Sequence, residues 1–279
     1  MDTPLVFGLG PMPGTDLVKA ADVVLSELPL PHIPQLPARG IGFDAIGRTA
    51  ALLDIPVDRG PRGWRVAARK RGLQDNMARD LDVLEELWAG KVDRVKVQLV
   101  GPWTLAAAIE MPNGHRMITD QGAVRDLQDA LEGAVGEHRG DVEKRIAPTV
   151  LQLDEPLLAD VVKGALAGAA EYERIAAVPE PEEAYAGYGE FLLNAPLLID
   201  APWQTTSLKE NKDALAGLLD RGARLAIPVT PPREVLQLFD ELQIDPGTAT
   251  IDTYADAGET LLETARNFRT AREMAAALR

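Results

Sequence analysis

The chain has 279 residues, of which 46% are hydrophobic and 26% charged, so it can bury a large globular core. Its net charge of −14 argues against binding to nucleic acid or to an anionic membrane surface. The absence of cysteine excludes disulfides, thiolate nucleophiles and thiolate metal ligands. Because no apolar stretch could span a bilayer and no signal-peptide pattern is present, we expect a cytoplasmic protein.

The first half of the chain alternates short apolar runs with helical patterns. A strand over residues 5–10 is followed by a helix that Thr15 or Asp16 caps and that runs to Leu28. Residues 29–40 contain four prolines and predict an irregular loop of a length that is often functional. The other elements predicted here are helices over 43–53, 72–90, from 105 and 120–146, and strands over 63–67, 94–100 and 149–155.

The alternation continues in the second half, with helices predicted over 157–169, 180–193, 208–219, 234–242 and 256–278, and strands over 197–200, 225–229 and 249–252. Seven strands separated by helices indicate a parallel sheet with right-handed crossovers. The first strand lacks the third glycine of a dinucleotide-binding turn. We therefore expect an α/β fold, a (β/α)8 TIM-like barrel with one βα unit degenerate or missing. No linker rich in glycine or serine divides residues 1–279, which predicts a single domain.

Two adjacent acids, Asp154 and Glu155, follow the apolar run 149–153 and precede Pro156. Proline cannot donate to a β-ladder, so the strand should stop near Glu155. Both acids then lie at the carboxyl end of a buried strand, where α/β proteins bind their ligands. Asp154 would hold a substrate ammonium or transfer a proton, with Glu155 beside it. The alternative is a solvated turn with two incidental acids.

Other candidate residues follow the other strands and would share one rim of a barrel. Trp103 and Trp203 would form apolar walls of a substrate site, or else pack beneath neighbouring helices. The further substrate-binding candidates are Gly10, Met12, Thr104, Asp200 and Tyr254. The basic run 69–71 is either a solvated strand end or an anion contact.

The three histidines give no sign of a metal site. His138 lies among charged residues and is predicted on a solvated helix face, while His32 and His115 lie in loops. No two of them have the spacing of metal ligands, so we expect no metal and no cofactor.

Three motifs resemble one family. Residues 151–156, Leu-Gln-Leu-Asp-Glu-Pro, resemble a barrel-strand motif of the catalytic domain of cobalamin-independent methionine synthase. Residues 101–105, Gly-Pro-Trp-Thr-Leu, resemble the Gly-Pro-x-Thr turn of that family and of uroporphyrinogen decarboxylase, and residues 9–13 resemble its first strand's Ile-Gly-Ser-x-Pro. The resemblance, over about residues 5–160, implies a (β/α)8 barrel and methyl transfer from a methyl-folate to the thiol of homocysteine. It also implies that Asp154 holds the amino group of homocysteine.

The second half departs from the family's pattern. The family binds zinc through histidine, cysteine, glutamate and a second cysteine, but residues 197–200 contain neither histidine nor cysteine. Ala255 stands where the last cysteine is expected, and Pro11 replaces the serine of the first turn. Between Asp200 and Arg224 the chain looks one βα unit short.

These departures leave three hypotheses for function. The first is a methionine-synthase-like methyltransferase that works without zinc or is inactive in that reaction, since an unactivated thiol is mostly protonated near neutral pH. The second is a cofactor-free enzyme closer to the decarboxylase branch. The third is a non-catalytic barrel that retains the pocket and binds a small ligand or a partner. The expected partner is a small-molecule substrate, such as homocysteine or a related amino acid.

Overall fold

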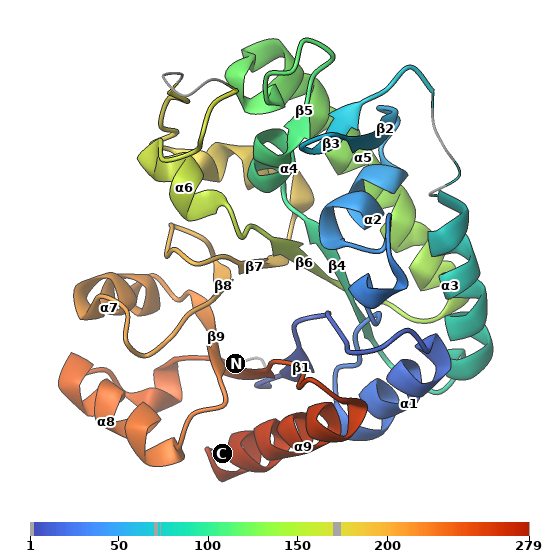
Figure 1. Ribbon diagram of the computed structural model, residues 1–279. Coiled ribbons are helices and arrows are strands. Elements are labelled where there is room, and N and C mark those ends of the chain that lie inside the picture. The colour runs from blue at the N-terminus through green and yellow to red at the C-terminus, as the bar shows by residue number, and fades with distance from the viewer. Residues whose placement is uncertain (1–2, 70–71, 73, 170–173, 279) are drawn as a thin grey trace.

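The computed structural model describes residues 3–69, 72, 74–169 and 174–278, and Figure 1 shows the arrangement of its elements. Seven parallel strands form one curled sheet in the order β1-β10-β9-β8-β7-β6-β4, with helices on its outside. The expected α/β barrel-like fold, with degenerate units, is confirmed. The strands are β1 (Val6–Gly8), β4 (Val95–Val100), β6 (Thr149–Asp154), β7 (Phe191–Asn194), β8 (Trp203–Thr205), β9 (Arg224–Pro228) and β10 (Ile251–Ala255).

Residues 30–35, which we call the closing segment, lie between the two edge strands β1 and β4. On the β1 side, the backbone N–H groups of Leu30 and Gln35 donate to carbonyls of residues 6 and 10. On the β4 side, both backbone groups of Lys96 hydrogen-bond to the segment, at 2.8 and 3.0 Å. The proline-rich stretch predicted as a loop therefore takes the place of a strand in the wall. Its prolines lack the N–H that a regular ladder requires.

Helices that connect the strands cover the outer face of the sheet: α1 (Leu17–Glu27), α2 (Ala45–Leu52), α3 (Gln74–Trp88), α4 (Pro102–Ala108), α5 (Gln121–Arg145), α6 (Leu158–Lys163), α7 (Lys212–Asp220), α8 (Pro232–Leu242) and α9 (Leu261–Ala277). The Asp16 side chain caps α1, as predicted, by accepting from the N–H of Lys19. Short 3-10 turns are η1 (Pro37–Arg39), η2 (Met117–Thr119), η3 (Pro181–Tyr188) and η4 (Pro246–Thr248).

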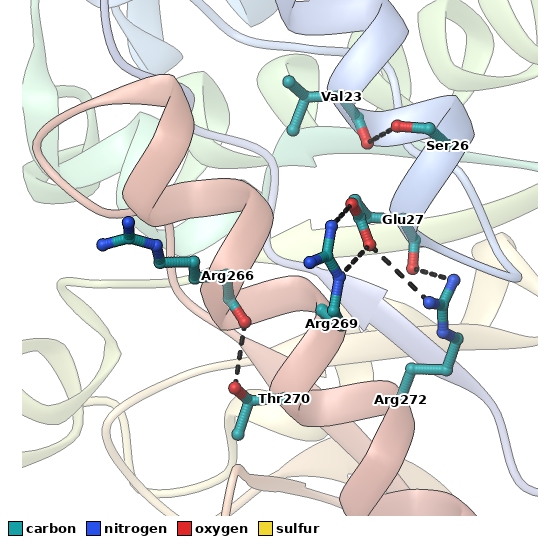
Figure 2. Close-up of polar contacts among 7 residues, drawn as sticks. All are labelled: Val23, Ser26, Glu27, Arg266, Arg269, Thr270 and Arg272. Carbon is teal, nitrogen blue, oxygen red and sulfur yellow. Dashed lines mark hydrogen bonds and ion pairs between the residues drawn. The ribbon is translucent and has the colours of Figure 1, made fainter.

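The first and last helices are joined by an ion-pair cluster, shown in Figure 2. Glu27, at the end of α1, is only 7% exposed. Its carboxylate accepts hydrogen bonds from the guanidinium group of Arg269 and forms a 3.7 Å ion pair with that of Arg272, both on α9. Hydrogen bonding to Arg269 lowers the pKa of Glu27 below its ordinary value. Elements at the two ends of the chain are thereby held together beside β1.

The predicted and observed elements differ most between residues 180 and 202, and the helix predicted over 157–169 ends already at Lys163. Residues 195–202 form no regular structure, so the strand predicted over 197–200 is absent. The helix predicted over 180–193 is instead η3 followed by the strand β7. The connection that lacks a helix is therefore the one between β7 and β8. The interval after Asp200, which we expected to be one unit short, contains β8, α7 and the start of β9.

A second, smaller sheet lies outside the barrel wall. It contains β2 (Val57–Gly60), β3 (Gly63–Val66) and β5 (Ile109–Glu110). The strand predicted over 63–67 corresponds to β3, but it pairs with β2 and β5 and belongs to this sheet. In the described part of the chain, no helix is both long enough and apolar enough to cross a membrane.

Apolar side chains fill the barrel interior at the end away from the carboxyl ends of the strands. A buried cluster takes one residue from each of six wall elements, namely five strands and the closing segment, as in the side-chain layers inside parallel barrels. Its members are Phe7, Leu30, Val150, Leu192, Trp203 and Ala226. Near it, the buried Asp252 forms a two-bond ion pair with Arg224, at 2.7 and 2.8 Å. Between this layer and the carboxyl ends of the strands, the interior contains polar side chains, among them Lys96, Gln98 and Gln152.

Candidate functional site

A cavity of about 800 Å³ opens at the carboxyl ends of the barrel strands. Asp154, Asn194, Thr205 and Tyr254, from the ends of β6, β7, β8 and β10, are among the residues that line it. The size is within the usual range for small-molecule sites, and the position is that of ligand sites in parallel barrels. We take this cavity as the candidate functional site.

Carboxylates are the charged groups among the described residues of the cavity lining. Asp44, Glu210 and Asp256 lie around it, and Asp154 is the fourth acid. The described lining contains no lysine, arginine or histidine. The rest is mostly apolar, including Leu9, Ile46, Leu197 and Leu198. The cavity therefore presents negative charge and apolar surface to a ligand.

The Asp154 carboxylate is held in one orientation. Its Oδ1 accepts from the side-chain amides of Gln152 and Asn194, each at 2.7 Å. Asn194 is fixed in turn because its Oδ1 accepts from the hydroxyl of Thr205 at 3.0 Å. Within the described residues Oδ2 accepts no hydrogen bond, and it is not among the fully buried unpartnered atoms. This oxygen remains for a donor in the cavity.

Beneath Asp154 lies a lysine that is completely buried. Lys96 extends from β4 into the barrel, and its ammonium donates to Oε1 of Gln152. The amide nitrogen of Gln152 donates to Asp154 and to the carbonyl of Leu9. One side chain therefore bridges a buried cation and a buried anion.

Burial shifts the pKa values of both ends of this bridge. It raises the pKa of Asp154, although the hydrogen bond from Asn194 and the charge of Lys96 oppose the rise. It lowers the pKa of Lys96 from 10.5 to about 7, while the charge of Asp154 acts in the opposite direction. Burial therefore disfavours the charged form of both groups.

Glu155 is fully buried but lies outside the cavity lining. Its carboxylate accepts from the N–H groups of Trp103 and Thr104, at 3.0 and 2.7 Å, and from the hydroxyl of Tyr185 at 3.1 Å. It thus binds the first turn of α4, where backbone N–H groups have no partner within the helix. Burial raises the pKa of Glu155 to about 7, against the effect of these donors.

The other sequence-predicted residues separate into two groups. Thr104 and Tyr254 line the cavity with Asp154. Gly10 is buried beneath it, where an added Cβ would come within 3.2 Å of the Gln98 side chain. Met12 is 3% exposed and belongs to the hydrophobic core, so it does not form part of the cavity wall we expected.

Both candidate tryptophans and Asp200 lie away from the cavity. Trp103 faces a separate outer cleft and donates through its indole N–H to the carbonyl of Pro181 at 2.9 Å. Trp203 packs in the lower barrel layer, with its ring 6.4 Å from that of Phe7. Asp200 is exposed and pairs with Arg221 at 3.2 Å. Neither tryptophan lines the cavity: Trp103 contacts η3, and Trp203 packs inside the barrel rather than beneath a helix.

The predictions for His138 and for the basic run 69–71 can also be compared with the structure. His138 is only 6% exposed, so the prediction of a solvated face was wrong, and burial lowers its pKa to about 4. Arg69 is exposed, whereas Lys70 and Arg71 of the basic run lie outside the described residues, as does Leu73.

Sequence reasoning missed the polar residues that support Asp154. Lys96 and Gln98 alternate with apolar residues in β4, and Gln152 and Asp154 do the same in β6. These strands are paired in register, Gln98 with Gln152, so all four side chains face the same side of the sheet. The sequence did contain a signal for this arrangement. Polar residues occur at every second position in two strands whose other residues are mostly apolar.

The zinc implied by the family resemblance does not fit the residues present. Within the described residues, no three histidine, cysteine, aspartate or glutamate side chains gather as a metal site. The cavity offers only carboxylates and neutral oxygens, whereas zinc sites in proteins are built mainly from histidine and cysteine.

The comparisons with known proteins bear on the fold. A B12-independent methionine synthase from Shewanella sp. W3-18-1, solved in complex with selenomethionine, matches with a TM-score of 0.59 and 11% identity over 99% of this chain and 97% of that chain. A Pseudomonas aeruginosa protein described as an aldo-keto reductase gives a TM-score of 0.34 and 12% identity over 99% and 91% of the two chains. No family model and no curated protein matches the sequence. The first likeness shows a shared TIM-barrel fold, whereas the second is too weak to show a common fold.

Proposed function

We propose that the protein binds a small molecule with a protonated amine, of the class of homocysteine and related amino acids, and that Asp154 holds the amino group. The observation that carries this proposal is the orientation of Asp154. Two amide donors fix Oδ1, while Oδ2 is left for a donor in the cavity. A hydrogen bond between an ammonium and a carboxylate is among the stronger polar contacts in proteins.

The charge of the cavity supports a cationic group over an anionic one. The four acids and the absence of a basic residue in the described lining would repel a polycarboxylate substrate. This disfavours the decarboxylase-like alternative. The Shewanella protein was solved with selenomethionine, an amino acid. That ligand belongs to the same chemical class and has an apolar side chain suited to a partly apolar cavity.

The reaction implied by the resemblance is methyl transfer from a methyl-folate to the thiol of homocysteine. We propose that this chain binds the amino acid without a metal and forms methionine very slowly or not at all. The described residues supply no ligand set that would turn a thiol into a thiolate. A free thiol with a pKa of about 8.5 is only a few per cent ionised at pH 7.

Calorimetric titration with homocysteine and with methionine tests the proposal. Asp154→Asn should weaken binding about 10-fold to 100-fold, since a hydrogen bond to a charged group contributes about 1.5–3 kcal/mol. Asp129→Asn, which removes an exposed acid from α5, is the matched control and should bind like the wild type. Equal binding by the Asp154 variant, or by an analogue that lacks the amino group, would refute the assignment.

A further inference from the structure

The surroundings of Lys96 are unusual for a charged group. Its side chain is fully buried, and no carboxylate contacts its nitrogen directly in the described part of the chain. The nitrogen donates to Oε1 of Gln152. It also reaches the Gln98 oxygen, at 3.2 Å, when that amide is turned so that its nitrogen donates to the carbonyl of Ile33. The third neighbour is the ring of Phe7, whose centre is 5.3 Å away.

This set of neighbours provides two oxygen acceptors for the Lys96 nitrogen. A neutral amine carries two hydrogens, so Gln152 and Gln98 satisfy it completely. An ammonium carries three, and the third has only an aromatic ring to face, which is a weaker partner. The site can therefore hold Lys96 in its neutral form without leaving a buried donor unpaired.

The protonated form depends on the charge of Asp154. Gln152 joins the two groups, so Asp154 is the nearby anion that compensates the buried ammonium. A ligand ammonium at Oδ2 would place a second cation beside the same carboxylate, in a setting where charges are poorly solvated. Two cations that share one buried anion repel each other strongly.

We propose that binding of an ammonium ligand to Asp154 expels the proton of Lys96, so that the charge of the ligand replaces the charge of the lysine. This inference rests on the proposed function and adds a rule for how the site selects its occupant. The Lys96 ammonium becomes an amine, and its proton passes to the buffer. No covalent bond to carbon or sulfur changes. Asp154 is therefore balanced by one cation throughout, the Lys96 ammonium before binding and the ligand ammonium after it.

The neighbouring titratable groups are consistent with this exchange. The pKa of Lys96, lowered to about 7 by burial, makes the loss of its proton accessible near neutral pH. His32, on the closing segment, stays neutral because burial and the charge of Lys96 lower its pKa well below the ordinary value. On the cavity side of Asp154, the other acids are Asp44, Glu210 and Asp256, and burial raises the pKa of the Tyr254 hydroxyl.

Calorimetry in two buffers of different ionisation enthalpy measures the protons released when methionine binds. Methionine has no thiol, so its own titration does not interfere. At pH 6 the wild type should release close to one proton per ligand, and at pH 8 only a small fraction, because Lys96 is then mostly neutral before binding. Lys96→Met lacks this proton and should release clearly less at pH 6, where any proton that still leaves comes from Asp154, whose pKa rises further without the charge of Lys96. Lys91→Met, at an exposed lysine after α3, should behave like the wild type.

The possible outcomes separate the two proposals. Methionine binding without proton release at pH 6, or equal release by Lys96→Met, overturns the exchange and leaves amine binding in place. No methionine or homocysteine binding at all refutes the proposed function. A further measurement, which needs neither ligand nor variant, tests a premise of the exchange, namely that Lys96 loses its proton near neutral pH. It is NMR titration of the Lys96 Cε carbon in the wild type. A midpoint near 7 supports the exchange, whereas a lysine still protonated at pH 9 overturns it.

Discussion

Asp154 and Glu155 are consecutive in the chain, yet their carboxylates serve opposite sides of the barrel wall. Asp154 lies inside, where it accepts from Gln152 and Asn194 and lines the cavity. Glu155 is turned towards α4, where it accepts from backbone N–H groups of the first turn. Successive side chains of a strand point to opposite faces, which accounts for the division. One acid belongs to the candidate site and the other to the structure that surrounds it.

Glu155→Ala should destabilise the fold by about 3 kcal/mol or more. The substitution leaves two buried backbone N–H groups and the Tyr185 hydroxyl without their acceptor, and each orphaned group costs about 1–3 kcal/mol. Equilibrium unfolding in urea measures the loss. Glu190→Ala, at an exposed glutamate, is the control and should change the free energy of unfolding by less than about 0.5 kcal/mol. A Glu155 variant as stable as this control would contradict the capping role.

Gly101→Ala should also destabilise the protein, by about 1–3 kcal/mol, because it overpacks the same contact. An added Cβ would lie 2.4 Å from Oε1 of Glu155, too close for either group to remain in place. Gly133→Ala is the matched control in α5, where an added Cβ meets nothing within 4 Å. Alanine favours a helix interior, so this second variant should gain about 0.5–1 kcal/mol. Thermal unfolding should show a lower melting temperature for Gly101→Ala and a higher one for Gly133→Ala.

The contribution of Glu155 to the stability of the fold should fall as pH rises from about 4.5 to about 7, whereas the buried His32 and His138, whose pKa values burial lowers, act in the opposite direction. Over this window the unfolded chain loses the Glu155 proton, whereas the folded chain, in which burial raises the pKa to about 7, retains it. The folded state binds the extra proton, so its advantage is complete below pH 4.5 and disappears above pH 7. The difference between the two pKa values corresponds to about 3 kcal/mol. Glu155→Gln cannot titrate and should lose this part of the slope in urea unfolding measured at several pH values.

Methionine formation from methyl-folate and homocysteine should be undetectable or very slow, with or without added zinc. A carboxylate of ordinary pKa is about four pH units too acidic to deprotonate a thiol, a mismatch of about 5–6 kcal/mol. Burial raises the pKa of Asp154 and narrows this gap, and Lys96, the other candidate base, is not part of the cavity lining. Chromatographic detection of methionine, with parallel elemental analysis, tests the expectation. Rapid turnover, or one firmly held zinc per chain, would contradict it.

Much of the fold could be predicted because local patterns agreed with tertiary structure. The strands that became β1, β4, β6, β9 and β10 are short apolar runs bounded by turn residues, and each was placed within a few residues. The cap of α1 was predicted as well, since Asp16 accepts from the backbone N–H of Lys19. These features depend on neighbouring residues in the chain.

The region from 180 to 205 could not be predicted, for a physical reason. Phe191, Leu192 and Leu193 are all buried, because β7 has packed side chains on both faces. A strand without alternation cannot be distinguished from the end of a helix by periodicity alone. Likewise, the closing segment became part of the wall only through bonds to strands far along the chain. Lys96 was overlooked because a lysine in a strand is usually exposed, and only the register of β4 against β6 places it inside.

The closing segment has a consequence for the kinetics of the barrel interior. It is irregular, interrupted by prolines, and hydrogen-bonded directly to the backbone of Lys96. Such a stretch should open locally more often than the continuous ladder between β4 and β6, because fewer cooperative hydrogen bonds must break. Its opening would give water a path to the buried nitrogen that does not pass through the cavity. The rate at which the Lys96 N–H hydrogens exchange with solvent would then measure how often the closing segment separates from β4.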